Sequence, residues 1–172
     1  MKIFVAGHRG MVGSAVVRAL EGKAGTTVLT QTRQQLDLTD PVAVDRWFSQ
    51  EQPEQVVDAA ARVGGILENS RKRVEFLLDN LRIQNNVMES AFRHGCKKFL
   101  FLGSSCIYPK HAPQPIPEES LLTGPLEPTN DAYALAKITG IRLAQAYRDE
   151  YGKSAISAMP TNLYGPGDNF NP

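Results

Sequence analysis

Near its N-terminus the chain reads Gly7-His8-Arg9-Gly10-Met11-Val12-Gly13, immediately after a short apolar run from Ile3 to Ala6. Glycine at three of these positions lets the backbone turn tightly, approach a pyrophosphate closely and bring the following helix against the strand. The N-terminus of that helix faces the phosphate charge in such sites. A plain strand-to-helix turn is the alternative, but the position of this stretch at the start of a β-α-β succession favours a dinucleotide site.

The rest of the chain continues to alternate between strand and helix. Short apolar runs predict four more strands, around Val28-Leu29, around Val56-Val57, from Lys98 to Leu102 and from Ser154 to Met159. Helices are predicted from Met11 to Leu20, from Asp40-Pro41 onward, from Arg71 to His94 and from Asp131 to Tyr151. We expect Asp40 to cap its helix, Gly95 to end the long helix in the left-handed conformation, and Asn130 or Asp131 to cap the last one.

This alternation predicts an α/β fold with a doubly wound parallel sheet, Rossmann-like, covered by helices on both faces. Residues 1–172 are expected to form one NADP-binding domain, with the sheet halted after about the fifth strand. Residues 109–128 contain too many prolines for a helix or a central strand and are expected to form a loop. Ligands bind at the carboxyl ends of the strands in such sheets, where the motifs of this chain fall.

The composition excludes several classes of protein. A formal net charge of +1 over 172 residues gives no electrostatic reason to expect nucleic acid or an anionic membrane as a partner. No apolar run approaches the length that spans a membrane, and the N-terminus does not resemble a signal peptide. Cys96 and Cys106 are too few for a disulfide framework. We therefore expect a cytoplasmic protein without a metal site.

The residues after the second strand bear on the choice of dinucleotide. NAD sites carry an acidic residue there to hold the ribose 2′-hydroxyl, whereas this chain reads Leu29-Thr30-Gln31-Thr32-Arg33. Arg33, assisted by Arg9, is suited to pair with a 2′-phosphate. The alternative is that Arg33 is only a surface residue. The sequence thus predicts a preference for NADP(H).

Further residues are expected around the cofactor. Asp37 and Leu38 are predicted to close over the adenine end, and Ala60 lies in a run of small residues against which a cofactor can lie flat, although small residues also serve plain packing. The cofactor residues predicted from the chain itself are Gly7, Arg9, Gly10, Met11, Val12, Gly13, Arg33, Asp37, Leu38, Ala60 and Lys137.

A Tyr–Lys pair carries the predicted chemistry. Tyr133 and Lys137 are four residues apart on a predicted helix and so project from one face. A ketone that accepts a hydride also needs a proton, which a tyrosine can donate when a nearby ammonium stabilises its phenolate; the lysine can also hold the nicotinamide ribose. Ser104, just past the fourth strand, is placed to hydrogen-bond the substrate oxygen. A core tyrosine beside a surface lysine is the alternative.

Several stretches together resemble the extended short-chain dehydrogenases/reductases, and among them the GDP-L-fucose synthase family. The resemblance runs from Lys2 to Pro172 and rests on the glycine turn, on residues 103–109 (Gly-Ser-Ser-Cys-Ile-Tyr-Pro) and on residues 160–166 (Pro-Thr-Asn-Leu-Tyr-Gly-Pro). Residues 126–130 (Leu-Glu-Pro-Thr-Asn) and 63–66 (Val-Gly-Gly-Ile) fit the same family. Segment 103–109 is its most specific part.

The resemblance implies an activity and residue roles. This family epimerises C3 and C5 of GDP-4-keto-6-deoxy-D-mannose and then reduces its ketone with NADPH, which implies a GDP-sugar substrate. By position, Ser104, Tyr133 and Lys137 serve the reduction, and Cys106 is one acid/base of the epimerisation. Asn162 contacts substrate, while Pro160 and Leu163 lie by the nicotinamide. Cys106 also has a plain alternative, because a buried free cysteine often acts only as a small hydrophobe.

The chain also departs from the family pattern. Family members continue beyond Pro172 with a C-terminal substrate domain and a second epimerisation histidine, and no histidine of this chain follows Asn162. We expect a fragment with an open sheet edge, poor substrate binding and a tendency to associate. A non-catalytic NADP(H)-binding module and a related nucleotide-sugar epimerase or dehydratase remain as alternatives. The resemblance further implies a homodimer through the helices at Arg71–His94 and Asp131–Tyr151.

Overall fold

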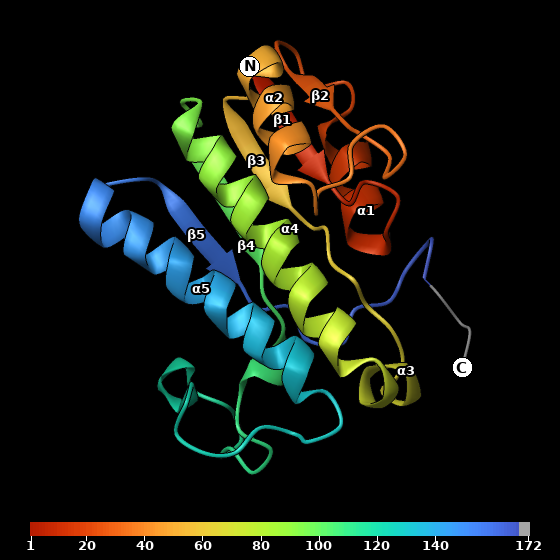
Figure 1. Cartoon of the computed structure of the whole chain (residues 1–172), viewed down its shortest axis with the longest axis vertical. Helices are drawn as coiled ribbons and strands as arrows, with labels where there is room; N and C mark the ends of the chain where they lie inside the picture. Colours follow the sequence, from red (N-terminus) through yellow and green to blue (C-terminus); the bar gives the residue numbers. More distant parts are fainter. Residues whose placement is uncertain (169–172) are drawn as a thin grey trace.

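A parallel five-stranded sheet forms the centre of the protein, in the order β2-β1-β3-β4-β5 (Figure 1). The computed structural model describes residues 1–168, apart from the side chain of Ile66. The strands are β1 (Lys2–Ala6), β2 (Thr27–Leu29), β3 (Gln55–Asp58), β4 (Lys98–Leu102) and β5 (Ala155–Ala158). The helices are α1 (Met11–Leu20), α2 (Pro41–Glu51), α3 (Ile66–Arg71), α4 (Arg73–Arg93) and α5 (Asp131–Tyr151), with 3₁₀ turns η1 (Ser105–Ile107) and η2 (Glu118–Ser120). The predicted Rossmann-like α/β fold is confirmed.

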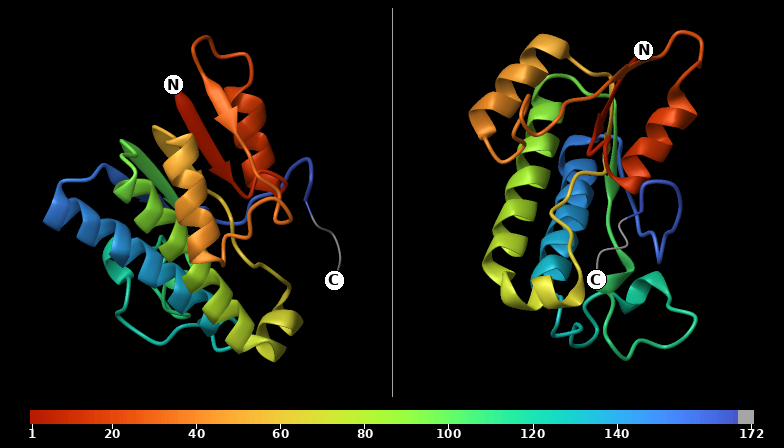
Figure 2. Two further views of the ribbon diagram at one scale, coloured as in Figure 1. Left: turned by 45° about the horizontal axis from the view of Figure 1, so that its top comes forward. Right: turned by 90° about the vertical axis from the view of Figure 1, so that its right-hand side faces the viewer.

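The helices form two layers around the sheet. The right-hand view of Figure 2 shows α1 on one face and α2, α4 and α5 on the other. Beneath the three-helix layer, neighbouring strands align Phe4, Val56, Phe99 and Ala155 in one row across the sheet, and all four are buried. Burying apolar surface in this way is the main stabilising contribution to such a fold.

The opposite face is covered less evenly. The next row of the ladder joins Val5, Val57, Leu100 and Ile156. Val5, beside α1, is fully buried, whereas Ile156 on the edge strand β5 is 58% exposed. Apolar surface of the described chain is therefore open at this edge of the sheet, as the sequence predicted for β5.

The strand order creates a crevice between β1 and β3. From β1 the chain passes to β2 on one side, and later returns to β3, which pairs with the other side of β1. The connections thus run in opposite directions from this point, and ligands in open α/β sheets bind at the carboxyl ends of the strands where this reversal occurs. The glycine turn after β1 and the segment after β3 both lie there.

The predicted start of α2 and end of α4 are confirmed. Asp40 is the N-cap of α2, and its side chain accepts hydrogen bonds from the backbone N–H groups of Val42 and Ala43. Pro41 occupies the first turn, where its missing N–H costs nothing. Gly95 follows α4 with a φ of +86°, the left-handed conformation that glycine adopts without strain.

The prediction of one helix from Arg71 to His94 is wrong at its N-terminal end. Two helices, α3 and α4, meet at Lys72, whose φ of −117° and ψ of 42° lie outside the helical range. The two sides of this break make different contacts, local on the side of α3 and long-range on the side of α4. The Asn69 side chain holds the backbone carbonyls of Gly64 and Gly65, and Arg73 binds Asp131 of α5.

The predicted cap of α5 is confirmed in its position but not in its hydrogen bond. Asn130 occupies the N-cap position, but its side chain makes no capping hydrogen bond. Asp131 lies inside the first turn, and both of its carboxylate oxygens accept hydrogen bonds from Arg73, at 2.8 and 2.7 Å. A contact between α4 and α5 has replaced the local cap.

Two further features concern the chain as described. Cys96 and Cys106 are both free thiols, in agreement with the sequence analysis. Within residues 1–168, every helix is too short or too polar to cross a membrane.

Candidate active site

A cavity of about 770 Å³ opens at the carboxyl ends of β1, β2 and β3. The glycine turn, residues 31–39 and residues 59–63 supply most of its wall, with Asp79 and Ile83 from α4. Of the predicted cofactor residues it brings together Gly7, Arg9, Gly10, Met11, Val12, Gly13, Arg33, Asp37, Leu38 and Ala60. The described lining does not include Lys137, Pro160 or Leu163. Ten predicted residues from three separate segments of the chain thus line one cavity, where the direction of the strand connections reverses.

Two glycines of the turn have no room for a side chain. Gly7 has a φ of +76°, and a Cβ there would lie 2.6 Å from the carbonyl oxygen of Ala59. A Cβ on Gly13 would overlap the backbone of Gly7 and lie 2.9 Å from Cα of His8. The turn can therefore fold tightly and bring the N-terminus of α1 to the cavity, which is the arrangement that a pyrophosphate requires.

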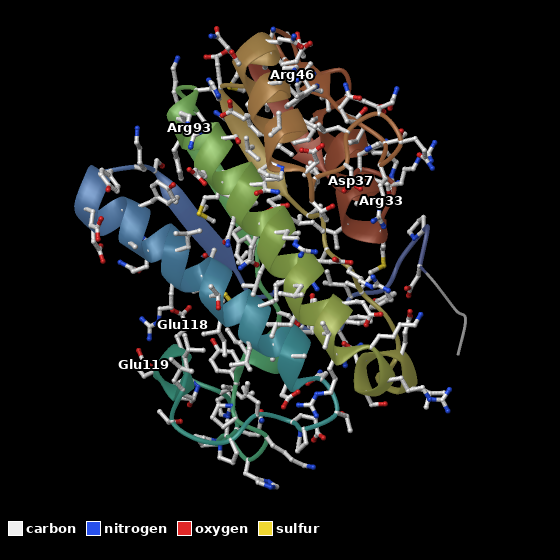
Figure 3. The ribbon with its side chains drawn as sticks, viewed as in Figure 1. Arg33, Asp37, Arg46, Arg93, Glu118 and Glu119 are labelled. Carbon is white, nitrogen blue, oxygen red and sulfur yellow. The ribbon has the colours of Figure 1, made fainter. Side chains whose placement is uncertain are left out.

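Arg33 and Asp37 form an ion pair at the rim of this cavity, and Figure 3 shows their side chains next to each other. Nε of Arg33 lies 3.7 Å from Oδ2 of Asp37, and the Arg33 side chain is 74% exposed. Asp37 Oδ1 accepts hydrogen bonds from the backbone N–H and the hydroxyl of Thr39. The Thr39 N–H in particular holds the pKa of Asp37 below its usual range. Arg33 therefore has guanidinium N–H groups exposed at the rim of the cavity.

A smaller pocket of about 240 Å³ lies where β4, the start of α5 and the segment after β5 meet. It brings together Ser104, Cys106, Tyr133 and Asn162, four of the predicted catalytic and substrate residues. The rest of its described lining is Val63, Gly64, Asn69, Ser105, Asn130 and Thr161. Val63 lines both cavities, so the small pocket is a neighbour of the large one.

Lys137 lies behind this pocket, and its side chain is absent from the described lining of both cavities. It is 3% exposed, and Nζ donates a hydrogen bond of 2.7 Å to the backbone carbonyl of Leu102. Nζ also lies 4.7 Å from the ring centroid of Phe101 and 5.8 Å from that of Tyr133. Burial lowers the pKa of Lys137, while the charges of Asp58 and Cys106 oppose this change.

The two acidic groups of the small pocket hold their protons tightly. Burial raises the pKa of Tyr133, and the charge of a Cys106 thiolate would raise it further. Burial also raises the pKa of the Cys106 thiol, against the hydrogen bond from Ser104 and the charge of Lys137. The phenol and the thiol are therefore both protonated at neutral pH, which suits them to donate a proton.

Some residues that line these cavities or lie buried next to them were not predicted from the sequence. Asp58, at the end of β3, is fully buried beside Phe101, its partner across the ladder. Burial raises its pKa to about 6, although the charge of Lys137 opposes this. The sequence feature that could have identified Asp58 is an acidic residue within an otherwise apolar strand.

Arg62 and Asp79 were missed as well. They line the large cavity as an ion pair of 2.8 Å, with the guanidinium over the ring of Phe76. Asn69 and Asn130 of the small pocket, and Gly167 and Asp168 of the large one, were also not predicted as site residues. They carry no local sequence signal, because only the fold brings them to the cavities.

Comparison with known proteins adds to this geometry. The model of the NAD dependent epimerase/dehydratase family matches residues 3–172. The chain is 60% identical over 171 residues to GDP-L-fucose synthase 1 of Arabidopsis thaliana, covering 99% of this chain and 53% of that protein. It is 50% identical over 171 residues to GDP-L-fucose synthase of Escherichia coli (strain K12), covering 99% and 53%. The chain thus spans about half the length of the curated relatives it matches.

Solved structures agree with this relationship. A GDP-D-glycero-L-gluco-heptose synthase from Campylobacter jejuni, determined in the presence of NADPH, has a TM-score of 0.95 at 38% identity, covering 99% of this chain and 50% of that one. A GDP-L-fucose synthetase from Naegleria fowleri bound to NADP has a TM-score of 0.87 at 35% identity, covering 99% and 56%.

Proposed function

Because the chain belongs to the NAD dependent epimerase/dehydratase family, we propose that residues 1–172 form the NADP(H)-binding, catalytic unit of a GDP-L-fucose synthase. The reaction is 3,5-epimerisation of GDP-4-keto-6-deoxy-D-mannose followed by reduction of its 4-keto group. One observation carries the proposal: Ser104, Cys106 and Tyr133 line a single pocket beside the cavity of the glycine turn. Relatives 50–60% identical to this chain bear the name of that enzyme.

The large cavity fits a dinucleotide. Gly7 and Gly13 let the turn pack tightly against the backbone of the protein, which brings the N-terminus of α1 to the cavity, where it can face a pyrophosphate. The exposed guanidinium of Arg33, with Arg9 in the same lining, favours a 2′-phosphate and so NADP(H) over NAD(H). Structural relatives have been solved with NADPH or NADP, which supports this choice.

The small pocket suits the reduction of a ketone. The bound cofactor supplies the hydride. Tyr133 donates its proton to the sugar oxygen at C4, and Ser104 donates a hydrogen bond to the same oxygen. The buried ammonium of Lys137, 5.8 Å from the Tyr133 ring centroid, stabilises the phenolate that remains.

We assign one of the two epimerisation groups to this chain. Cys106 lines the pocket as a protonated thiol, and burial raises its pKa. A thiol of this kind returns a proton to a carbon beside the ketone, whereas abstraction needs a base that receives one. Asn162, in the same lining, is proposed to contact substrate, and Pro160 and Leu163 to lie by the nicotinamide.

We further propose a cytoplasmic homodimer built through α4 and α5. The two helices pack side by side on one face of the sheet (Figure 1). Val74 and Leu78 of α4 and Leu135 of α5 are exposed apolar side chains, which a second copy would cover. Light scattering of the wild type and of Leu78→Glu would test this, because a dimer through these helices should become a monomer on substitution.

The test of the proposed function follows NADPH absorbance in a mixture of the purified chain, NADPH and GDP-4-keto-6-deoxy-D-mannose. Consumption of NADPH that stops in Tyr133→Phe supports the proposal. If NADPH binds in a fluorescence titration but is not consumed, the chain is a non-catalytic NADP(H)-binding module. Consumption with another 4-keto nucleotide sugar alone would indicate a related epimerase or reductase.

A further inference from the structure

Two asparagines in the lining of the small pocket each have a buried side-chain oxygen with no hydrogen-bond partner among the described residues. They are Oδ1 of Asn69 and Oδ1 of Asn130. We propose that these two oxygens accept hydrogen bonds from hydroxyl groups on the sugar ring and so select a hydroxylated sugar over its deoxy counterpart. This inference rests on the proposed function and adds two specificity-determining residues to it.

The orientation of the Asn69 amide follows from its donors. Asn69 is 7% exposed, and Nδ2 donates to the backbone carbonyls of Gly64 at 2.7 Å and Gly65 at 3.1 Å. Carbonyl oxygens only accept, so the amide cannot be reversed without losing both bonds. Oδ1 is then left buried as an acceptor without a described partner.

Oδ1 of Asn130 also lacks a hydrogen-bond partner among the described residues, but for a different reason. Asparagine at an N-cap position normally accepts a hydrogen bond from a backbone N–H of the first helical turn. Asn130 occupies that position of α5 without making the bond, and its Oδ1 is buried with no partner among the described residues. Buried polar atoms are rarely left unsatisfied in folded proteins, so an unsatisfied acceptor on a residue that lines a pocket points to a donor on a ligand.

The chemistry of the lining identifies that donor. Each amide oxygen only accepts, so the ligand must present N–H or O–H groups. None of the described lining residues of this pocket is Asp, Glu, Lys or Arg, so nothing there compensates a ligand charge. Neutral hydroxyls fit better than an ammonium. The volume of about 240 Å³ suits one sugar ring, since pockets for larger ligands span roughly 300–1,000 Å³.

The position of the amides relative to the catalytic side chains agrees with this assignment. Ser104 and Tyr133, in the same lining, are proposed to act on the oxygen at C4. Asn69 comes from α3 and Asn130 from the start of α5, so the two acceptors belong to separate elements that both contribute to this pocket. They are available for hydroxyls elsewhere on the ring.

The test measures binding without reduction. Calorimetry with the chain saturated with NADP⁺ would compare GDP-4-keto-6-deoxy-D-mannose with the same compound lacking the 2-hydroxyl or the 3-hydroxyl. We expect the wild type to bind each deoxy compound about 5- to 10-fold more weakly, the range for loss of one neutral hydrogen bond. Asn130→Leu should bind the parent sugar correspondingly more weakly and lose the discrimination at one hydroxyl. Asn69→Leu should lose the discrimination at the other hydroxyl.

Matched controls separate this role from folding. Asn130→Leu breaks no side-chain hydrogen bond that the described structure shows, and the NADP⁺ affinity of each variant reports the fold. Ser70→Ala and Thr129→Val change the neighbouring residue outside the described pocket lining and should keep the discrimination.

Two results would overturn this inference and leave the proposed function intact. One is equal binding of all three sugars by the wild type, and the other is full discrimination between the sugars in both Asn variants. If NADP⁺ binds but no sugar nucleotide does, the proposed substrate fails and this inference fails with it.

Discussion

The ammonium of Lys137 donates a hydrogen bond of 2.7 Å to the backbone carbonyl of Leu102, which joins α5 to the carboxyl end of β4. The side chain therefore acts on the small pocket from behind, over the ring of Phe101, while Tyr133 one turn earlier lines the pocket itself. The proposed role of the Lys137 charge, stabilisation of the Tyr133 phenolate, is consistent with this position behind the pocket.

Replacing Lys137 by methionine should lower the rate of ketone reduction by about 10²-fold or more, the range for loss of assisted proton transfer. The apolar side chain keeps much of the packing over Phe101 and removes the charge. Lys97→Met, which changes a largely exposed lysine, is the control. NADPH consumption at saturating substrate measures the effect. A rate within twofold of the wild type would show that the charge of Lys137 is not needed.

The charge of Asp58 should make stability depend on pH. Burial raises its pKa from 3.8 to about 6, so the folded state binds this proton more tightly than the unfolded state. The free energy of unfolding should therefore fall as the pH rises from about 4 to about 6, because the folded protein must then bury a carboxylate. The shift of about two units corresponds to about 3 kcal/mol.

Asp58→Asn removes this titration and is the matched variant. Urea unfolding of both proteins at pH 4 and pH 7 gives the difference in unfolding free energy between wild type and variant. Measuring the change in that difference cancels the pH-independent effect of the substitution on packing. A difference that stays constant between the two pH values would contradict the raised pKa.

Gly13→Ala should reduce NADPH affinity at least about 10-fold and destabilise the protein, because the added Cβ would overlap the backbone of Gly7. Gly65→Ala is the control, since a Cβ there meets nothing within 4 Å. Fluorescence titration with NADPH and thermal unfolding of both variants measure the two effects. Wild-type affinity in Gly13→Ala would mean that the turn can open without affecting the cofactor.

Arg33→Ala should weaken NADPH binding by about 10- to 100-fold, the range for a charge-assisted hydrogen bond, and leave NADH binding unchanged. Its partner Asp37 remains held by Thr39, so the loop should stay in place. Arg46→Ala is the control, because Arg46 lies on α2, away from Arg33 (Figure 3). Equal losses for the two cofactors would assign Arg33 a role outside 2′-phosphate recognition.

Local sequence determined much of the fold. The strand runs, the cap of α2 by Asp40 and the end of α4 at Gly95 depend on residues within a few positions of each other. The glycine turn and the four-residue spacing of Tyr133 and Lys137 are equally local. Their energetics hardly change with distant parts of the chain, and so the elements could be predicted.

Only the tertiary structure decided the strand order, the break at Lys72 and the contents of the two cavities. Asp131 lies inside the first turn of α5 and accepts two hydrogen bonds from Nη2 of Arg73, 58 residues earlier, instead of capping the helix. Asn69 and Asn130 meet in one pocket, and Lys137 turns away from it to Leu102, through contacts between separate elements. Such choices depend on which surfaces pack together, because long-range burial and ion pairing outweigh the small local preferences of a single residue.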